Sequence, residues 1–193
     1  MHHVVPQGNG RCSIVLNDGD RFSYLRRLEG IAADLGWTVH ASCLMDTHHH
    51  AVVETPEPNL GVGMRRLLGG HARWFNLRHD REGTLFAPHY WSRSIRDDAA
   101  LYQSCLYVVL NPVAAGLCGH PAEWPWSSYS RTANVPDDIF VAGEERLLRM
   151  FGDSPAEARA TYRAVVDACV ERIQNSRAGD ASGLRQAIEQ MSD

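Results

Sequence analysis

Residues 37–55 read WTVHASCLMDTHHHAVVET, and this segment sets the fold class expected for the whole chain. Its apolar and β-branched residues predict two strands, at 37–45 and 48–55, with a short turn between them. Strands joined by so short a connection pair antiparallel, because parallel neighbours need a long crossover. The sheet of this protein is therefore expected to be antiparallel.

Helix and strand patterns alternate on either side of this hairpin. Strands separated by helices, without repeated long crossovers, are typical of an α+β sandwich with an antiparallel sheet. The expected elements, in chain order, are short strands at 2–6 and 13–16, a helix that Asp18 or Asp20 caps and that ends at Leu35 before Gly36, a helix at 60–79 capped by Asn59, a strand at 89–95, a helix from Asp97 to about 111–112, and helices at 143–151 and 156–175.

Composition limits the class of protein. The 193 residues are 44% hydrophobic and 22% charged, the balance of a globular protein that can bury a core. No run approaches the roughly 20 apolar residues of a membrane span, and the N-terminus lacks a secretory signal. Five cysteines, an odd number without a C-x-x-C pair, favour reduced thiols over disulfides or a zinc ribbon. We therefore expect a cytoplasmic protein without a membrane partner.

Charge is unevenly distributed along the chain. The net charge is −4, but all 19 basic residues are arginine, whose planar fork suits phosphate better than the point charge of lysine. Residues 60–96 carry seven arginines against two acids, so the middle of the chain is locally basic. For each arginine of the helix at 60–79, a solvated helix face and a phosphate contact are equally good interpretations. The candidates for phosphate contacts are Arg65, Arg66, Arg73 and Arg78.

A histidine cluster in the second expected strand is the strongest pointer to chemistry. Because side chains alternate along a strand, His48 and His50 share one face and His49 points to the other. Two neutral imidazoles two residues apart can hold one divalent cation. Asp46 and Glu54 would lie on the same face if the strand extended that far. The alternative is a polar strand end with histidines gathered by chance.

The helix after Asp97 offers a second chemical group. Tyr107 and Asn111 lie one turn apart, on a face separate from the apolar face of this helix. A phenol can act as a nucleophile, and a carboxamide oxygen can complete the ligand set of a metal. An ordinary boundary tyrosine is the alternative interpretation of Tyr107. Tyr102, on the same helix, is expected to pack against apolar neighbours.

Together these groups indicate chemistry on a phosphodiester. A divalent metal would act as a Lewis acid while Tyr107 attacks phosphorus, which leaves a phosphotyrosine on one DNA end and a hydroxyl on the other. A metal-dependent hydrolase of small phosphoesters is a further alternative, but it needs an enclosed pocket and another general base. Trp124, Trp126 and Tyr129 can stack on bases, although packing is the simpler interpretation for at least two of them. Other histidines are expected at the surface or its boundary without special roles: His71, His79, His89 and His120.

Five segments of the chain resemble the single-tyrosine HUH transposases, and within them the REP-associated tyrosine transposase branch. The resemblance covers about residues 2–130, with the segments in the family's order and spacing. It implies a ferredoxin-like α+β fold, with the antiparallel sheet sandwiched by helices, for a catalytic domain at 1–131. Residues 132–193 would form a linker and a C-terminal helical extension. The segments are CLMDTHHH at 43–50, ETPEPNL at 54–60, RWFN at 73–76, YVVLNPV at 107–113 and EWPWSSY at 123–129.

The resemblance also implies roles for individual residues. His48 and His50 would bind Mg²⁺ or Mn²⁺, Asn111 would be the third ligand, and Tyr107 would be the nucleophile. The substrate would be single-stranded DNA that carries hairpins, nicked and transferred through a covalent 5′-phosphotyrosine in a bacterial cytoplasm. The sequence leaves both a monomer and a homodimer open.

Several positions depart from the family pattern. Asp46-Thr47 stands where the family usually has Pro-Asn, and Gln7 and Ala114 stand where it commonly has arginine. These departures keep the catalytic set and thin the basic set on which DNA affinity depends. The alternative function is therefore a domesticated or decayed relative that binds DNA hairpins as a regulator without cleaving them.

Overall fold

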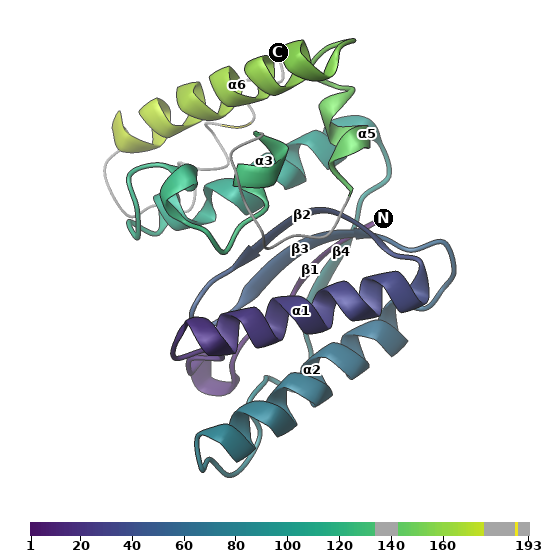
Figure 1. The fold of residues 1–193 in the computed structure, drawn as a ribbon, viewed down its shortest axis with the longest axis vertical. Coiled ribbons are helices and arrows are strands. Elements are labelled where there is room, and N and C mark those ends of the chain that lie inside the picture. Colours follow the sequence, from purple (N-terminus) through teal and green to yellow (C-terminus); the bar gives the residue numbers. More distant parts are fainter. Residues whose placement is uncertain (134–142, 176–187, 189–193) are drawn as a thin grey trace.

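The structure is a computed structural model that describes residues 1–133, 143–175 and 188. Figure 1 shows a sheet between two layers of helices. In chain order the elements are β1 (His2–Val5), η1 (Asn9–Arg11), α1 (Asp18–Leu35), β2 (Thr38–Leu44), β3 (His49–Glu54), α2 (Leu60–Arg78), β4 (Trp91–Ser94), α3 (Asp98–Ala114), η2 (Pro121–Glu123), α4 (Tyr129–Thr132), α5 (Glu144–Leu148) and α6 (Pro155–Asn175).

The four strands form one sheet in the order β2-β3-β1-β4, and every neighbouring pair is antiparallel. This order arises because each helical crossover skips one position in the sheet. The chain leaves β1 through α1 and enters β2, and β3 then fills the place between β2 and β1. From β3 the chain passes through α2 to β4, on the other side of β1. α1 and α2 cover one face of the sheet, and α3, α5 and α6 lie on the other (Figure 1). The expectation of a ferredoxin-like α+β fold with helices on both faces is confirmed.

Each face of the sheet buries its own apolar cluster. On the face covered by α1 and α2, Leu28, Leu67 and Phe75 are almost fully buried against Ala51 and Val53 of β3. On the other face, residues of α3 pack against the sheet and against α5 and α6. Burial of each large side chain contributes about 1.5–3 kcal/mol. Because both faces of β3 are covered, its hydrophobic run lies in the centre of the molecule.

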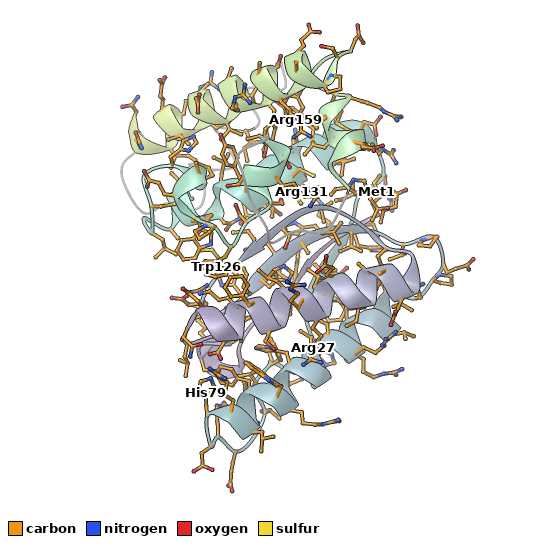
Figure 2. All side chains as sticks on the ribbon, in the orientation of Figure 1. Met1, Arg27, His79, Trp126, Arg131 and Arg159 are labelled. Atoms are coloured by element: carbon orange, nitrogen blue, oxygen red, sulfur yellow. The ribbon has the colours of Figure 1, made fainter. Side chains whose placement is uncertain are left out.

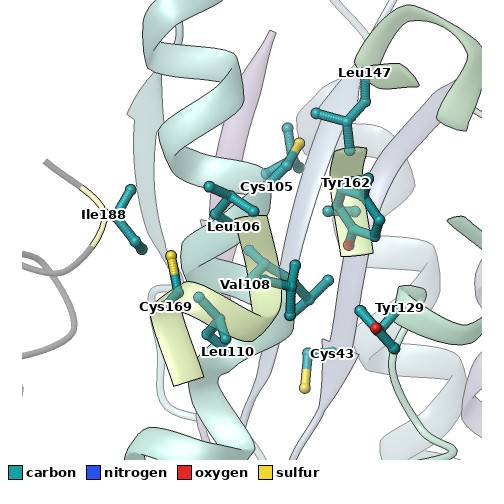
Figure 3. Close-up of a cluster of buried hydrophobic side chains, with 14 of the residues drawn as sticks. Cys43, Cys105, Leu106, Val108, Leu110, Tyr129, Leu147, Tyr162, Cys169 and Ile188 are labelled. Carbon is teal, nitrogen blue, oxygen red and sulfur yellow. The ribbon is translucent and has the colours of Figure 1, made fainter. Parts of the chain in front are cut away.

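The helix α6 is fixed to the α3 layer by polar and apolar contacts. The Arg159 guanidinium donates to the carbonyl oxygens of Arg131 and Thr132, at 2.8 and 2.7 Å, which ties α6 to the end of α4 (Figure 2). Figure 3 shows Tyr162 and Cys169 among the buried side chains of α3. The described part of the C-terminal segment therefore shares a core with the face of the sheet that α3 covers.

Local signals set the ends of α1, with one correction to the expectation. Gly36 ends the helix with a left-handed φ of 66°, as expected. The N-cap is Asn17 rather than Asp18 or Asp20, and the Asn17 side chain accepts a hydrogen bond from the Asp20 amide. Asp20 is fully buried, and its carboxylate accepts from the Leu16 amide. It therefore holds the loop before the helix and does not act as the N-cap.

One further expectation is wrong, and one helix end lies two residues beyond the expected position. Residues 13–16 form no strand, because the Ile14 amide donates to the Asp46 carbonyl in a loop contact that leaves no strand ladder. α3 does not end at 111–112 but continues to Ala114. Pro112 lacks only one amide donor, and its own carbonyl still accepts from Leu117.

Asn59 precedes α2, as expected, but its side chain does not cap that helix. Its Oδ1 accepts from the indole N–H of Trp37 at 2.6 Å, and its Nδ2 donates to the Leu35 carbonyl at 3.1 Å. Asn59 thus ties the start of α2 to the end of α1.

Most of the expected linker, and nearly all of the residues after α6, lie outside the described residues. In the described part of the chain, no helix combines the length and the hydropathy that a membrane span requires.

Candidate active site

The histidine pair lies on the face of the sheet that α3 covers. His50 is the second residue of β3, opposite Cys43 of β2, and His48 comes immediately before the strand. Their ring centroids are 4.9 Å apart with the planes at 80°. His49 points to the opposite face, so the alternation expected from the sequence is confirmed.

Tyr107 reaches the same place from α3. Its ring centroid lies 5.7 Å from that of His50, and it is partly buried among the side chains of this face. Asn111 follows one turn later, and its Nδ2 donates to the backbone carbonyl of Tyr107 at 2.6 Å. The carboxamide oxygen of Asn111 is therefore the atom that can accept a hydrogen bond or bind a cation. The structure brings the phenol and the paired imidazoles to one side of the sheet.

His3 is a third imidazole at this site, and sequence reasoning missed it. It lies on β1 opposite Val52, which places its side chain on the face that carries His50. Its Nε2 is 3.2 Å from Nδ1 of His50, and its ring centroid lies 5.9 Å from that of Tyr107. The only sequence signal was a histidine within the expected first strand, and the register between β1 and β3 could not be known.

Hydrogen bonds orient the two candidate ligands. Nδ1 of His48 lies 2.9 Å from the Thr47 hydroxyl, and Nδ1 of His50 is engaged by His3. On each ring, Nε2 is therefore the nitrogen left to bind a cation. Such partners fix the tautomer and the orientation of metal-binding histidines.

Burial keeps these rings neutral. It lowers the pKa of His48, and it lowers the pKa of His50 well below the ordinary value of 6.5. Burial also lowers the pKa of His3 to about 4, and the nearby Arg93 acts in the same direction. A histidine must be neutral to act as a ligand, so the environment favours the form that metal binding needs.

His49 has a structural place on the opposite face. Its Nδ1 lies 3.1 Å from the Tyr24 hydroxyl, and its Nε2 lies 2.7 Å from the Ser42 hydroxyl. All three side chains are buried, and burial lowers the pKa of His49 to about 3. His49 thus ties β3 to both β2 and α1 directly beneath the histidine pair.

The two acids near the pair do not join it. The strand begins only at His49, so Asp46 lies in the preceding turn and forms an ion pair with Arg21 of α1. Glu54 lies at the far end of β3, where it contacts His40 at 2.8 Å and Arg146 at 3.5 Å. Because the strand does not extend back to Asp46, Asp46 does not share the face of the histidine pair.

The donor set fits a small divalent cation that keeps other ligands. Among the described residues, no group of three or more His, Cys, Asp or Glu side chains is arranged to hold a metal ion. Two imidazoles can therefore supply only part of a coordination sphere, and further ligands would come from an amide oxygen, water or phosphate. Mg²⁺ and Mn²⁺ accept such oxygen ligands, and imidazole favours Mn²⁺ of the two.

A cavity of about 350 Å³ opens beside the phenol. It lies between β4 and α3, and its walls include Trp91 and Arg93 of β4 together with His3, His50 and Tyr107. Sequence reasoning did not find this cavity, because it requires knowledge of how α3 crosses the edge of the sheet.

The arginines expected to contact DNA lie elsewhere. Arg65, Arg66, Arg73 and Arg78 are all exposed on α2, which covers the face of the sheet opposite Tyr107. Arg66 pairs with Asp34 at 2.6 Å, and Arg78 pairs with the buried Asp20 at 3.3 Å. The structure does not bring these arginines to the histidine pair.

The aromatic segment after α3 is mostly packed. Trp126 and Tyr129 are buried, and Trp124 is half-buried with its indole N–H donating to the Leu44 carbonyl at 3.1 Å. The Arg21 guanidinium lies over both tryptophan rings, 5.4 Å from each centroid. Tyr102 packs against Phe151 as expected. His71 is fully buried, so the expectation that it lies at the surface or its boundary is wrong.

A curated relative supports the resemblance to the REP-associated tyrosine transposases. A protein of Haemophilus influenzae assigned to the REP-associated tyrosine transposases is 29% identical to the chain over 112 residues. That match covers 51% of this chain and 64% of the relative, so the chain spans less than two thirds of the relative's length. No protein-family model matches the chain.

One solved structure shares the fold of this chain. A REP-associated tyrosine transposase bound to a REP hairpin superposes with a TM-score of 0.59 at 14% identity, over 74% of this chain and 86% of that one. An assigned transposase of Deinococcus radiodurans gives a TM-score of 0.41 at 19% identity, over 50% of this chain and 78% of that one. The resemblance to REP-associated tyrosine transposases is thus confirmed by a curated relative and by the fold.

Proposed function

We propose that this protein nicks single-stranded DNA and transfers the strand through a covalent bond to Tyr107. The observation that carries the proposal is the convergence of Tyr107 with His48 and His50 on one face of the sheet, with 5.7 Å between the ring centroids of Tyr107 and His50. The site combines a nucleophile with neutral imidazoles, as metal-assisted phosphoryl transfer requires.

In the proposed reaction the phenolic oxygen of Tyr107 attacks a backbone phosphorus in line with the 3′ oxygen. The bond between phosphorus and the 3′ oxygen breaks, the 3′ oxygen takes up a proton, and the phenol loses its own proton to solvent. The product is a 5′-phosphotyrosine and a free 3′ hydroxyl. Because the phosphodiester energy is kept in the tyrosine ester, another 3′ hydroxyl can reverse the step and join the strand elsewhere.

Mg²⁺ or Mn²⁺ would be held by Nε2 of His48 and of His50, with the Asn111 oxygen as a further ligand. Bound there, the ion would supply Lewis-acid polarisation of the phosphate. The chain's own contribution is to orient the ligands. Thr47 and His3 occupy the Nδ1 atoms, and the hydrogen bond from Asn111 to the backbone carbonyl of Tyr107 fixes the orientation of the carboxamide.

The substrate is proposed to be a DNA hairpin with single-stranded flanks. The relative of known structure is bound to a REP hairpin, and the fold is shared over most of both chains. The exposed Arg65 and Arg73 of α2 would contact phosphates of a hairpin long enough to pass the edge of the sheet. Arg66 and Arg78 would contribute less, because Asp34 and Asp20 partly neutralise them.

The test is an adduct assay with the purified protein and single-stranded hairpin oligonucleotides. Wild type with Mn²⁺ should give a covalent protein–DNA species that survives denaturing electrophoresis. Tyr107→Phe and added EDTA should each abolish it. Tyr102 lies on the same helix as Tyr107 and packs against Phe151. Tyr102→Phe is therefore the matched control and should still form the covalent species.

A regulator that binds hairpins without cleavage is the second candidate. The observation that favours it is that acids engage exposed arginines that could otherwise bind phosphate: Arg66 pairs with Asp34, and Arg78 pairs with Asp20. Hairpin binding that EDTA leaves unchanged, with no adduct on any tested strand, would select this function and reject the first.

A further inference from the structure

The cavity beside Tyr107 has a size and a composition that suit one nucleotide. Its volume of about 350 Å³ lies at the lower end of the range for small-ligand sites, which is far too small for a DNA duplex. It opens at the edge of the sheet, because among the described strands β4 is the last and pairs only with β1.

The described residues that line the cavity supply one positive charge and no negative charge, in a protein that is acidic overall. The chain carries a net charge of −4, yet none of the described residues that line the cavity is acidic. Arg93 provides a positive charge at the wall and is exposed. An anionic ligand is therefore favoured in this cavity more than at most other places on the protein surface.

Trp91 provides an aromatic surface at the mouth of the cavity. Its side chain is 52% exposed, the largest exposed fraction for an aromatic residue among the described part of the chain. The ring is held by an edge contact with His3, with 5.2 Å between centroids and an angle of 84°. A fixed, exposed indole beside an arginine is the combination with which proteins bind single-stranded nucleic acids.

The cavity is continuous with the nucleophile. Tyr107 and His50 line it, and His3 contacts Trp91, His50 and Tyr107. A strand whose phosphate lies at the phenol would therefore place a neighbouring base within reach of Trp91.

We infer that this cavity binds one unpaired nucleobase next to the phosphate attacked by Tyr107, with Trp91 stacked on the base and Arg93 in contact with a phosphate. The inference rests on the proposed function in taking single-stranded DNA as the ligand and Tyr107 as the nucleophile. Trp91 would act as a binding residue that sets the register of the strand. Stacking on any base is favourable, so the cavity would hold the strand in place more than it would read its sequence.

The experiment measures binding in the Tyr107→Phe background, where no phosphotyrosine can form. Hairpin oligonucleotides with single-stranded flanks would be titrated by fluorescence anisotropy, with each flanking nucleotide replaced in turn by an abasic one. Trp91→Ala should weaken binding of the intact strand by about 5- to 150-fold, the range of one base–aromatic stack. At one abasic position the variant should cause almost no further loss, because the stack is already missing there.

Matched variants separate stacking from damage to the fold. Trp91→Phe should retain most of the affinity, and Leu77→Ala, which removes an 85% exposed side chain from α2, should have no effect. Arg93→Ala should weaken binding and lower its salt dependence more than Arg26→Ala, an exposed arginine of α1 on the other face.

If the loss from Trp91→Ala is the same at every abasic position, or no larger than that from Leu77→Ala, the inference is wrong. The adduct assay is independent of this result. A wild-type protein without an adduct but with the abasic pattern would remove the proposed chemistry and leave the nucleotide site, and the reverse result would remove only the site.

Discussion

Nε2 of His3 lies 3.2 Å from Nδ1 of His50, although the two residues come from β1 and β3 and are 47 positions apart. If His50 offers Nε2 to a cation, its Nδ1 carries the proton and donates to His3. His3 then needs its own proton on Nδ1. The contact therefore selects the tautomers of both rings and links the first strand of the chain to the candidate metal site.

The first prediction concerns His3 as a positioning residue. His3→Leu should lower Mn²⁺ affinity by roughly 10- to 100-fold, the usual effect of removing the partner of a metal-binding histidine. His3→Gln can still accept from His50 and should lose less. Isothermal titration with Mn²⁺ measures the effect, and equal losses in the two variants would show that the hydrogen bond to His50 is not what His3 provides.

The second prediction separates three consecutive histidines. His48→Ala and His50→Ala should each abolish measurable Mn²⁺ binding. His49→Ala should instead lower the free energy of unfolding by about 1–3 kcal/mol, because the buried hydroxyls of Tyr24 and Ser42 would lose their partner.

Chemical denaturation and Mn²⁺ titration on all three variants check this contrast. A stable His49→Ala protein that binds no Mn²⁺ would contradict the assignment of His49 to the structural face. Wild type measured with and without EDTA is the control for stability that depends on metal.

The sequence was sufficient where the deciding interactions are local. Alternation along one strand separated His49 from its neighbours, and helical spacing placed Asn111 one turn after Tyr107. Capping signals located α1 and α3 to within a few residues. The class of fold followed from the order of strands and helices, because short connections leave few arrangements open.

What the sequence could not give depends on contacts between distant segments. The place of His3 requires the register of β1 against β3. His71 was expected at the surface or its boundary, but it is fully buried where α2 packs on α1, and its Nε2 donates to the Ile14 carbonyl at 2.8 Å. The ion pair of Arg21 with Asp46 depends on how the loop before β3 meets α1.

The third prediction uses that ion pair. The carboxylate of Asp46 engages Arg21, whose guanidinium lies over Trp124 and Trp126. Asp46→Asn should raise the affinity for single-stranded DNA by about two- to fivefold at low salt, the range of a weak surface ion pair. Asp46 is the exposed partner of this pair, whereas the Arg21 side chain is 12% exposed. The gain should disappear when Arg21→Gln is added.

Asp167→Asn is the control for that gain, because it makes the same change in net charge on α6, where Asp167 pairs with His120. Fluorescence anisotropy at several salt concentrations provides the measurement. An equal gain in both variants would mean that only the overall charge matters and that Arg21 is not released toward DNA.

The fourth prediction concerns stability in acid and rests on His71. Burial lowers the pKa of this imidazole below its ordinary value of 6.5, and its Nδ1 is buried without a hydrogen-bond partner. The unfolded chain therefore binds a proton more readily than the folded one. The contribution of His71 to the free energy of unfolding should be fully present above pH 6.5 and fall as the pH drops below it.

In His71→Gln, which can still donate to the Ile14 carbonyl, this pH dependence should be weaker. The difference in free energy of unfolding between wild type and variant should shrink toward low pH by up to about 1.4 kcal/mol per pH unit. Other buried histidines titrate in both proteins and cancel in the difference. Urea denaturation between pH 4.5 and 8 measures it, with the exposed His89→Gln as control; a difference from wild type that does not change with pH would show that His71 takes up its proton equally in both states.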